Sequence, residues 1–243
     1  MTYGFLPATK EEFDRSGIGV PDFVYVSGDA YVDHPSFGAA IITRILDAAG
    51  FSVAVLAQPN FRSTEDFMRY GKPRLGFLVS SGNVDSMVAH YTAAKKKRSD
   101  DWYSPGRRAG LRPDRAVVVY TNRIREAYGD IPVIIGGLEA SLRRFAHYDY
   151  WSDKVRRSIL VDSRADILSY GMGENSIRRI AELLARGVPV KKIRDVRGTA
   201  YLCRRGEKLN FDPVRGTREE PEGYDYDELK TSKAAYAAAF AEQ

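Results

Sequence analysis

Four turns of this chain carry small, polar or acidic side chains directly after a run of apolar residues. The richest is residues 27–38, which hold two carboxylates, a histidine, two serines and two glycines. Carboxylates and histidine can move protons or bind a cation, and glycine lets a ligand approach the backbone closely. The candidate ligand-binding residues of the four turns are Ser27, Asp29, Asp33, His34, Ser36, Ser80, Asn83, Gly136, Gly137, Glu139, Ser141, Gly173 and Glu174.

These turns are expected to share one edge of a parallel sheet, where the crevice outside the carboxyl ends of the strands binds ligands. A purely structural role stays open for many of the residues, because glycines make tight turns and serine and asparagine cap helices. His34 could bind a metal ion or donate to a phosphate, or could bond Asp33 where the next helix begins.

Several classes of site are excluded by absent motifs. The sequence has no P-loop, no Gly-x-Gly-x-x-Gly after its first strand and no Gly-x-Ser-x-Gly elbow. Its single cysteine, Cys203, rules out an internal disulfide and a cysteine-built metal cluster within this chain. His90 and His147 lack the spacing of a metal site, so no catalytic or metal-binding residue is assigned.

The elements that must position the turns alternate along the chain. Strands are predicted at 23–27, 52–57, 74–80, 132–137 and 166–171, and helices at 38–49, 83–97, 114–128, 154–161 and 174–186. Strands alternating with helices predict an α/β fold, a doubly wound and mostly parallel five-stranded sheet of flavodoxin-like order 2-1-3-4-5. Residues 99–113, with their prolines and glycines, are expected to form a long exposed loop.

The composition changes after residue 190. Residues 192–203 suggest a short strand arm, 210–226 a polar connector and 228–242 an alanine-rich helix without a capping glycine. We therefore expect an α/β domain over residues 1–190 and a connector arm and helix over 191–243. The uncapped end of that helix suggests a fragment whose next domain is absent.

Aromatic and arginine residues interleave over 141–160. This composition suits stacking on a planar ligand or docking of a partner domain. The alternative is a helix that packs Phe145, Tyr148, Trp151 and Val155 inward.

The 243-residue chain is modestly basic, with 37 Lys and Arg against 32 Asp and Glu. Pairs and runs of cations, such as 95–98 and 107–108, could contact nucleic acid, although a solvated face with no specific partner is the favoured explanation. No apolar run is long enough to span a membrane and no signal peptide is evident, so the expected location is cytoplasmic, with no membrane partner.

Residues 22–38, 74–80, 85–88 and 136–157 together closely resemble the N-terminal region of YgiQ-type radical SAM proteins. The resemblance implies an iron–sulfur protein that binds S-adenosylmethionine (SAM), with its 4Fe–4S cluster held by a Cys-x-x-x-Cys-x-x-Cys motif in a C-terminal TIM-type barrel. This chain lacks that motif. We therefore expect it to bind no cofactor alone, to be inactive alone, and to have the radical SAM barrel as its partner in cis, with the substrate unknown.

The predicted sheet also resembles the cobalamin-binding domain that precedes the barrel in other radical SAM enzymes. Gly136, Gly137 and Ser80 fit that pattern, but Asp33 and His34 are adjacent, so the usual Asp-x-His-x-x-Gly is missing. The expected function is to contribute substrate or cofactor contacts to the barrel. A corrinoid-binding module and an RNA-binding accessory module are the alternatives.

Overall fold

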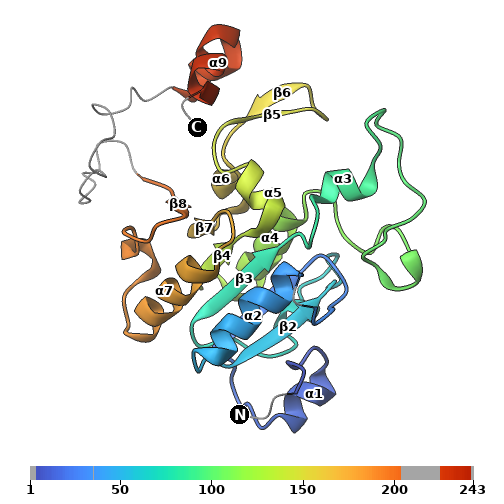
Figure 1. The fold of residues 1–243 in the computed structure, drawn as a ribbon, viewed down its shortest axis with the longest axis vertical. Coiled ribbons are helices and arrows are strands. Elements are labelled where there is room, and N and C mark those ends of the chain that lie inside the picture. The colour runs from blue at the N-terminus through green and yellow to red at the C-terminus, as the bar shows by residue number, and fades with distance from the viewer. Residues whose placement is uncertain (1–3, 35, 204–224, 242–243) are drawn as a thin grey trace.

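The computed structural model describes residues 4–34, 36–203 and 225–241, which contain one large sheet of order β2-β1-β3-β4-β7-β8 (Figure 1). Its strands are β1 (Phe23–Ser27), β2 (Val53–Ala57), β3 (Gly76–Ser80), β4 (Val133–Ile135), β7 (Ile167–Ser169) and β8 (Thr199–Tyr201). The first five strands are parallel and follow the predicted order 2-1-3-4-5. The predicted arm is β8, a sixth strand antiparallel to β7.

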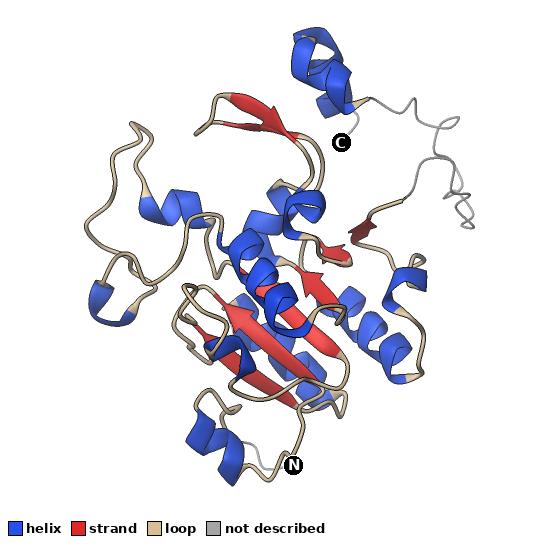
Figure 2. Ribbon diagram, turned by 180° about the vertical axis from the view of Figure 1, so that it is seen from behind, coloured by secondary structure: helices blue, strands red, loops and turns tan. Residues whose placement is uncertain are grey.

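Successive residues of β1 pack on opposite faces of the sheet, because side chains alternate along a strand. Phe23 and Tyr25 pack with α2 (Gly38–Ala48) and α7 (Glu174–Ala185) on one face. Val24 and Val26 pack with α4 (Ala116–Tyr128) and α6 (Ile159–Ser163) on the other. Every β1 residue is buried, since helices cover both faces (Figure 2).

The remaining elements lie around this body. They are α1 (Lys10–Arg15), η1 (Asp66–Met68), α3 (Ser86–His90), η2 (Pro105–Arg107), α5 (Gly137–Leu142), β5 (His147–Asp149), β6 (Lys154–Arg156), η3 (Val190–Lys192), α8 (Tyr226–Thr231) and α9 (Lys233–Ala241). None of the described helices is long and apolar enough to cross a membrane.

The helix predicted over 83–97 is wrong beyond its first turns. The helix α3 ends at His90, and Tyr91 has an extended backbone that bridges to Lys97. Between them Thr92 N–H donates to the Lys96 carbonyl and Lys95 adopts a left-handed φ of 59°. A tight turn therefore replaces the helix and holds the basic run on a loop.

The helix predicted over 154–161 is also wrong. Residues 147–156 form the antiparallel pair β5–β6, in which Tyr148 faces Val155. Helix α6 starts only after Ser158, whose hydroxyl accepts the N–H of Leu160. The inward-packing helix proposed for this segment is not formed, and Phe145 and Tyr148 are 45% and 49% exposed.

The C-terminal helix is present but broken in two at Ser232, which has an extended backbone and caps α9 by accepting the Ala235 N–H. Both halves reach the β5–β6 hairpin. The Tyr226 hydroxyl donates to the Val155 carbonyl, and the Tyr148 N–H donates to the Tyr236 hydroxyl. Most of the predicted connector, 210–226, lies outside the described residues, and the division at residue 190 stays a prediction.

Candidate functional site

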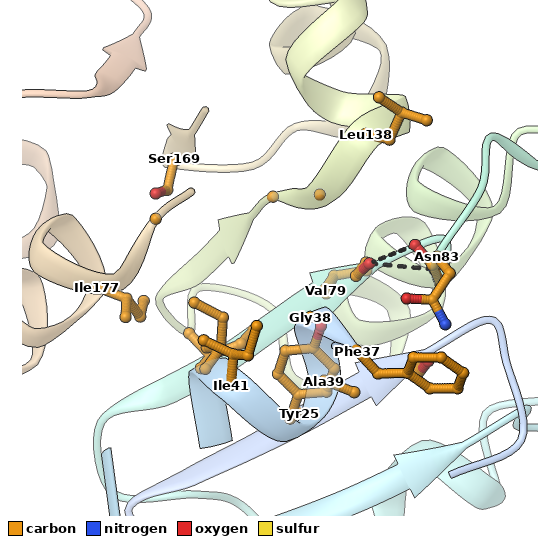
Figure 3. A pocket seen from close by; sticks show the side chains of 18 of the residues that line it. Tyr25, Phe37, Gly38, Ala39, Ile41, Val79, Asn83, Leu138, Ser169 and Ile177 are labelled. Carbon is orange, nitrogen blue, oxygen red and sulfur yellow. Dashed lines mark hydrogen bonds between the residues drawn. The ribbon is translucent and has the colours of Figure 1, made fainter. Parts of the chain in front are cut away.

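A cavity of about 270 Å³ lies at the carboxyl edge of the sheet, between the ends of β1, β3, β4 and β7 and the first turns of α2 and α7 (Figure 3). The predicted crevice is therefore formed. Its floor is apolar and aromatic, with Tyr25, Leu78 and Ile134 from the strands. Its walls are completed by side chains of both helices, Ile41, Ile42 and Ile177.

Tyr25 supplies a polar group to the otherwise apolar floor. The phenol is neutral at physiological pH and can donate a hydrogen bond, and burial raises its pKa further, to about 12. The Ser80 side chain is its hydrogen-bond neighbour. The arrangement suits a largely apolar group with a polar atom at its inner end.

The rim of the cavity is polar. The Ser80 hydroxyl accepts the Gly82 N–H at 3.1 Å, and the Ser169 and Ser176 hydroxyls lie 2.6 Å apart. Both α2 and α7 begin at this rim, and their N-cap residues, Phe37 and Gly173, give no side-chain cap. First-turn N–H groups are thus left without a side-chain partner where a polar part of a ligand would lie.

Gly137 is required by the close approach of two turns. Its φ of 81° is left-handed, and a Cβ there would lie 2.7 Å from the Ser80 hydroxyl. The chain after β4 can therefore pass against the end of β3 only with glycine at this position.

Most of the residues predicted from the four turns do come together. Those that line the cavity are Ser27, Asp29, Ser36, Ser80, Asn83, Gly136, Gly137, Gly173 and Glu174. The parallel register explains this, because Ser27 and Ser80 are direct partners at the ends of β1 and β3.

Asp33 and His34 do not line the cavity. The Asp33 carboxylate forms an ion pair with Arg44 of α2, and the His34 ring accepts the Ser36 N–H at 3.2 Å and packs on Phe37. Both residues therefore fix the start of α2. An imidazole ligand from His34 to a group inside the cavity does not fit this geometry.

Glu139 and Ser141 do not line the cavity either, and both have structural hydrogen-bond partners. The Glu139 carboxylate is 1% exposed and accepts the N–H groups of Ser86 at 2.9 Å and Val117 at 3.0 Å. It thereby joins α5 to the first turns of α3 and α4, and burial raises its pKa. The Ser141 hydroxyl donates to Gly137 within α5 and accepts the N–H of Gly171.

Asp29 borders the cavity, but its carboxylate is already engaged. It accepts the Asn83 N–H and a guanidinium N–H of Arg112, each at 2.6 Å. Arg112 is buried and also makes a bidentate contact with Asp101 at 2.7 and 2.8 Å. This buried Asp29–Arg112–Asp101 cluster holds the loop that precedes α4 against the edge of the sheet.

Sequence reasoning missed Arg112 and the apolar walls. A single arginine in a loop carries no periodic signal, so nothing marked it. The residues of the walls did carry a periodic signal. Ile42 and Leu46 share a face of α2 at helical spacing, and that face packs on the sheet. This spacing predicts that the residues are buried, but it does not predict that they line a cavity.

A 4Fe–4S cluster does not fit the residues present. Cys203 is the only cysteine in the sequence and is exposed, and no described group of three His, Cys, Asp or Glu side chains could hold a metal ion. Chemistry at this edge would therefore rest on shape, hydrogen bonding and exclusion of water.

The family model described as "Radical SAM N-terminal" matches residues 5–243. A UPF0313 protein of Clostridium botulinum is 56% identical over 97% of this chain, which spans 36% of that relative. The UPF0313 protein YgiQ of Escherichia coli is 57% identical over 82% of this chain and 27% of the relative. The chain thus spans about a third or less of the length of these curated relatives.

Among solved structures, the radical SAM methyltransferase TsrM from Kitasatospora setae, with cobalamin and a 4Fe–4S cluster bound, matches 76% of this chain and 29% of its own. The identity is 18% and the TM-score is 0.49.

Proposed function

The chain belongs to the radical SAM N-terminal family, and from that premise we propose that its cavity contributes substrate or cofactor contacts to a radical SAM domain of the same polypeptide. The observation that carries the proposal is the cavity at the carboxyl edge, which four turns of the sheet build together. In this division of labour the cluster and SAM of the other domain supply the radical chemistry. This chain binds and orients the substrate or cofactor and shields it from water.

Exposed apolar side chains at the mouth of the cavity support this partnership. Val32, Leu138 and Met172 line the cavity and are 47%, 47% and 78% exposed. Leu142 of α5, 61% exposed, lies on the same helix as Leu138. Exposed apolar groups gathered at one opening are typical of interaction surfaces, and we infer that another domain covers this one. Such cover would exclude water from the cavity.

The position of α8 and α9 also supports docking of a further domain near the mouth of the cavity. Both pack against the β5–β6 hairpin, which follows α5 directly in the chain. The relatives are about three times the length of this chain, which leaves ample polypeptide for a further domain in them. A radical SAM domain in cis is the occupant to which the proposal commits.

Amide hydrogen exchange tests the docking. We expect residues 137–145 and 170–174 to exchange more slowly in a polypeptide that carries both parts than in the 243-residue chain. Residues 10–15 of α1 serve as the internal control and should exchange equally in both. Equal exchange at the mouth of the cavity in the two proteins would overturn the proposal.

A corrinoid-binding module is the second candidate, and the apolar walls of the cavity favour it. The cavity could take the flat aromatic base of a corrinoid's tail between α2 and α7. No histidine would then bond to cobalt from this edge, because the His34 ring accepts the Ser36 N–H outside the cavity. We expect hydroxocobalamin to remain with the protein after desalting. Ile177→Trp, which fills the cavity, should abolish this retention, and His34→Ala should leave the visible spectrum unchanged. A colourless protein after desalting would eliminate this candidate.

A further inference from the structure

Residues 91–110 form an arm that stands out from the body between α3 and α4, which we call the basic arm (Figure 1). Six cations and two carboxylates lie within it. The cations are Lys95, Lys96, Lys97, Arg98, Arg107 and Arg108, and all six are exposed.

The cations of the basic arm differ from most arginines elsewhere in the described chain. Arg44, Arg74 and Arg125, for example, each pair with a carboxylate. None of the six in the basic arm has a carboxylate of the described residues within ion-pair distance; Lys95 and Arg98 donate to backbone carbonyls instead. Lys97 does help to lower the pKa of the Asp114 carboxylate, although the two form no ion pair. Most of the positive charge of the arm is therefore open to an anionic partner.

A groove of about 550 Å³ runs along the basic arm. Its lining includes the cations Lys96, Lys97 and Arg98 and the aromatic rings of Trp102 and Tyr103. The carboxylates of Asp100 and Asp101 also line it, and Asp101 is neutralised by its ion pair with Arg112. Cations and aromatic rings thus face the same hollow, which is the composition of a surface that binds both phosphates and bases.

Trp102 is the most conspicuous side chain of this groove. Its indole is 70% exposed, and the Arg107 guanidinium lies 3.7 Å from a ring centroid of the indole. An exposed tryptophan backed by a guanidinium presents a flat, electron-rich surface beside a positive charge.

The basic arm is held in a defined shape. Lys95 and Arg107 have left-handed backbones with φ of 59° and 57°, a conformation that costs about 1 kcal/mol for residues with a side chain. At the base of the arm Asp101 binds the buried Arg112, and the Ala30 N–H donates to the Tyr103 carbonyl. On the other side Lys95 lies 4.7 Å from the Tyr150 ring centroid.

We propose that the basic arm binds single-stranded nucleic acid, with the phosphates on the run 95–98 and Arg108 and a base stacked on Trp102. A duplex would hide its bases, so the exposed indole favours an unpaired strand. A purely acidic protein surface would use the cations and leave the indole unused. The arm adjoins the cavity edge through Ala30 and Asp29, so a bound strand would lie beside the cavity.

Tryptophan fluorescence gives a direct test, because Trp102 and Trp151 are the only tryptophans of the sequence. Trp151→Phe keeps an aromatic ring against Tyr91 and makes Trp102 the sole reporter. Titration with oligouridylate and with oligothymidylate of about 16 nucleotides, the upper range of single-strand site sizes, should quench the emission. Quenching by only one of the two tells whether the natural strand is RNA or DNA.

Matched variants separate stacking from charge. Trp102→Ala should weaken binding about tenfold in a labelled-oligonucleotide assay, as the loss of one stacked base does. Lys96→Ala with Lys97→Ala should reduce the slope of log affinity against log salt by about 1.4, since each phosphate contact to a single strand contributes about 0.7. The matched control is Lys191→Ala with Lys192→Ala, two cations of η3, where Lys191 lies 3.5 Å from Asp130.

The control pair should leave both affinity and slope unchanged, and circular dichroism should confirm that every variant folds. No quenching by either oligonucleotide at low salt would overturn the proposal. Equal losses in the Lys96/Lys97 and Lys191/Lys192 variants would overturn it as well, since binding would then follow net charge alone.

Discussion

Arg112 is a buried cation between two carboxylates, and its contacts decide what Asp29 can do. Asp29 was expected to bind a ligand, yet its oxygens are satisfied by Arg112 and by the Asn83 N–H. Burial raises the pKa of Asp29, whereas Asp101, which takes the bidentate contact, has its pKa lowered by Arg112 although burial opposes this. One cation shared by two acids therefore stabilises them unequally.

Because the pKa of Asp101 is lowered, we predict that its contribution to the free energy of unfolding depends on pH. The pKa of Asp101 lies below its ordinary value of 3.8 in the folded chain, so its ionised form stabilises the fold above that pH. The contribution disappears as the pH falls through the lower, folded value. Asp101→Asn should lower the free energy of unfolding by about 3 kcal/mol at neutral pH, the cost of breaking a buried pair.

Urea unfolding between about pH 3 and pH 7 checks this prediction, because the cost of Asp101→Asn should shrink at the acid end. Asp29→Asn is the control and should cost less at neutral pH, since burial already disfavours its charge. A cost for Asp101→Asn that stays constant across the range would contradict the assignment.

At the scale of elements, the turns after β1, β3 and β4 pack closely against one another at the edge of the sheet that bears the cavity. The ends of β1 and β3 are in direct register, so their turns leave the sheet side by side. A Cβ on Gly28 would overlap the Ser81 carbonyl oxygen and lie 2.9 Å from the Arg112 side chain. Gly28 is therefore needed because its missing side chain lets two turns touch at the edge of the sheet, and not only because of the geometry of its own turn.

Gly28→Ala should consequently destabilise the chain by about 3 kcal/mol, at the upper end of overpacking effects, because backbone atoms must shift. Gly38→Ala is the matched control, since nothing lies within 4 Å of a Cβ at that position. Thermal or urea unfolding of the two variants gives the comparison. Similar stabilities for both would show that the turns can move apart freely.

At the scale of the molecule, three segments lie outside the sheet and the helices that cover it: the basic arm, the β5–β6 hairpin and the helices α8 and α9. The hairpin touches both of the others, through Lys95 on one side and Tyr236 on the other. The apolar side chains at the mouth of the cavity, Val32, Leu138 and Met172, remain exposed, and this is where we place the radical SAM domain.

The isolated chain is predicted to hold no iron–sulfur cluster. With Cys203 as its sole cysteine, anaerobic incubation with iron and sulfide should leave substoichiometric iron after desalting. Iron analysis and visible absorbance measure this, with Cys203→Ser as the control that should behave identically. Full cluster loading of the isolated chain would contradict the division of labour proposed here.

The sequence by itself determined the sheet and the edge at which the cavity lies. Alternating apolar runs and helical spacings set the first five strands in their order, and strand-end position alone brought Ser27, Ser80 and Gly136 to one edge. This works because strand alternation and parallel register are local rules that the backbone must obey.

Only the tertiary structure decided which of the reactive groups are free. Nothing in the sequence ranks the carboxylates of Asp33, Glu139 and Asp29. In the structure, Asp33 pairs with Arg44 and Asp29 pairs with Arg112. Glu139 accepts backbone N–H groups at the starts of two helices. The short strands 147–149 and 154–156 likewise replaced a helix through pairing with each other. Such outcomes depend on contacts between residues up to 83 positions apart, which no local pattern carries.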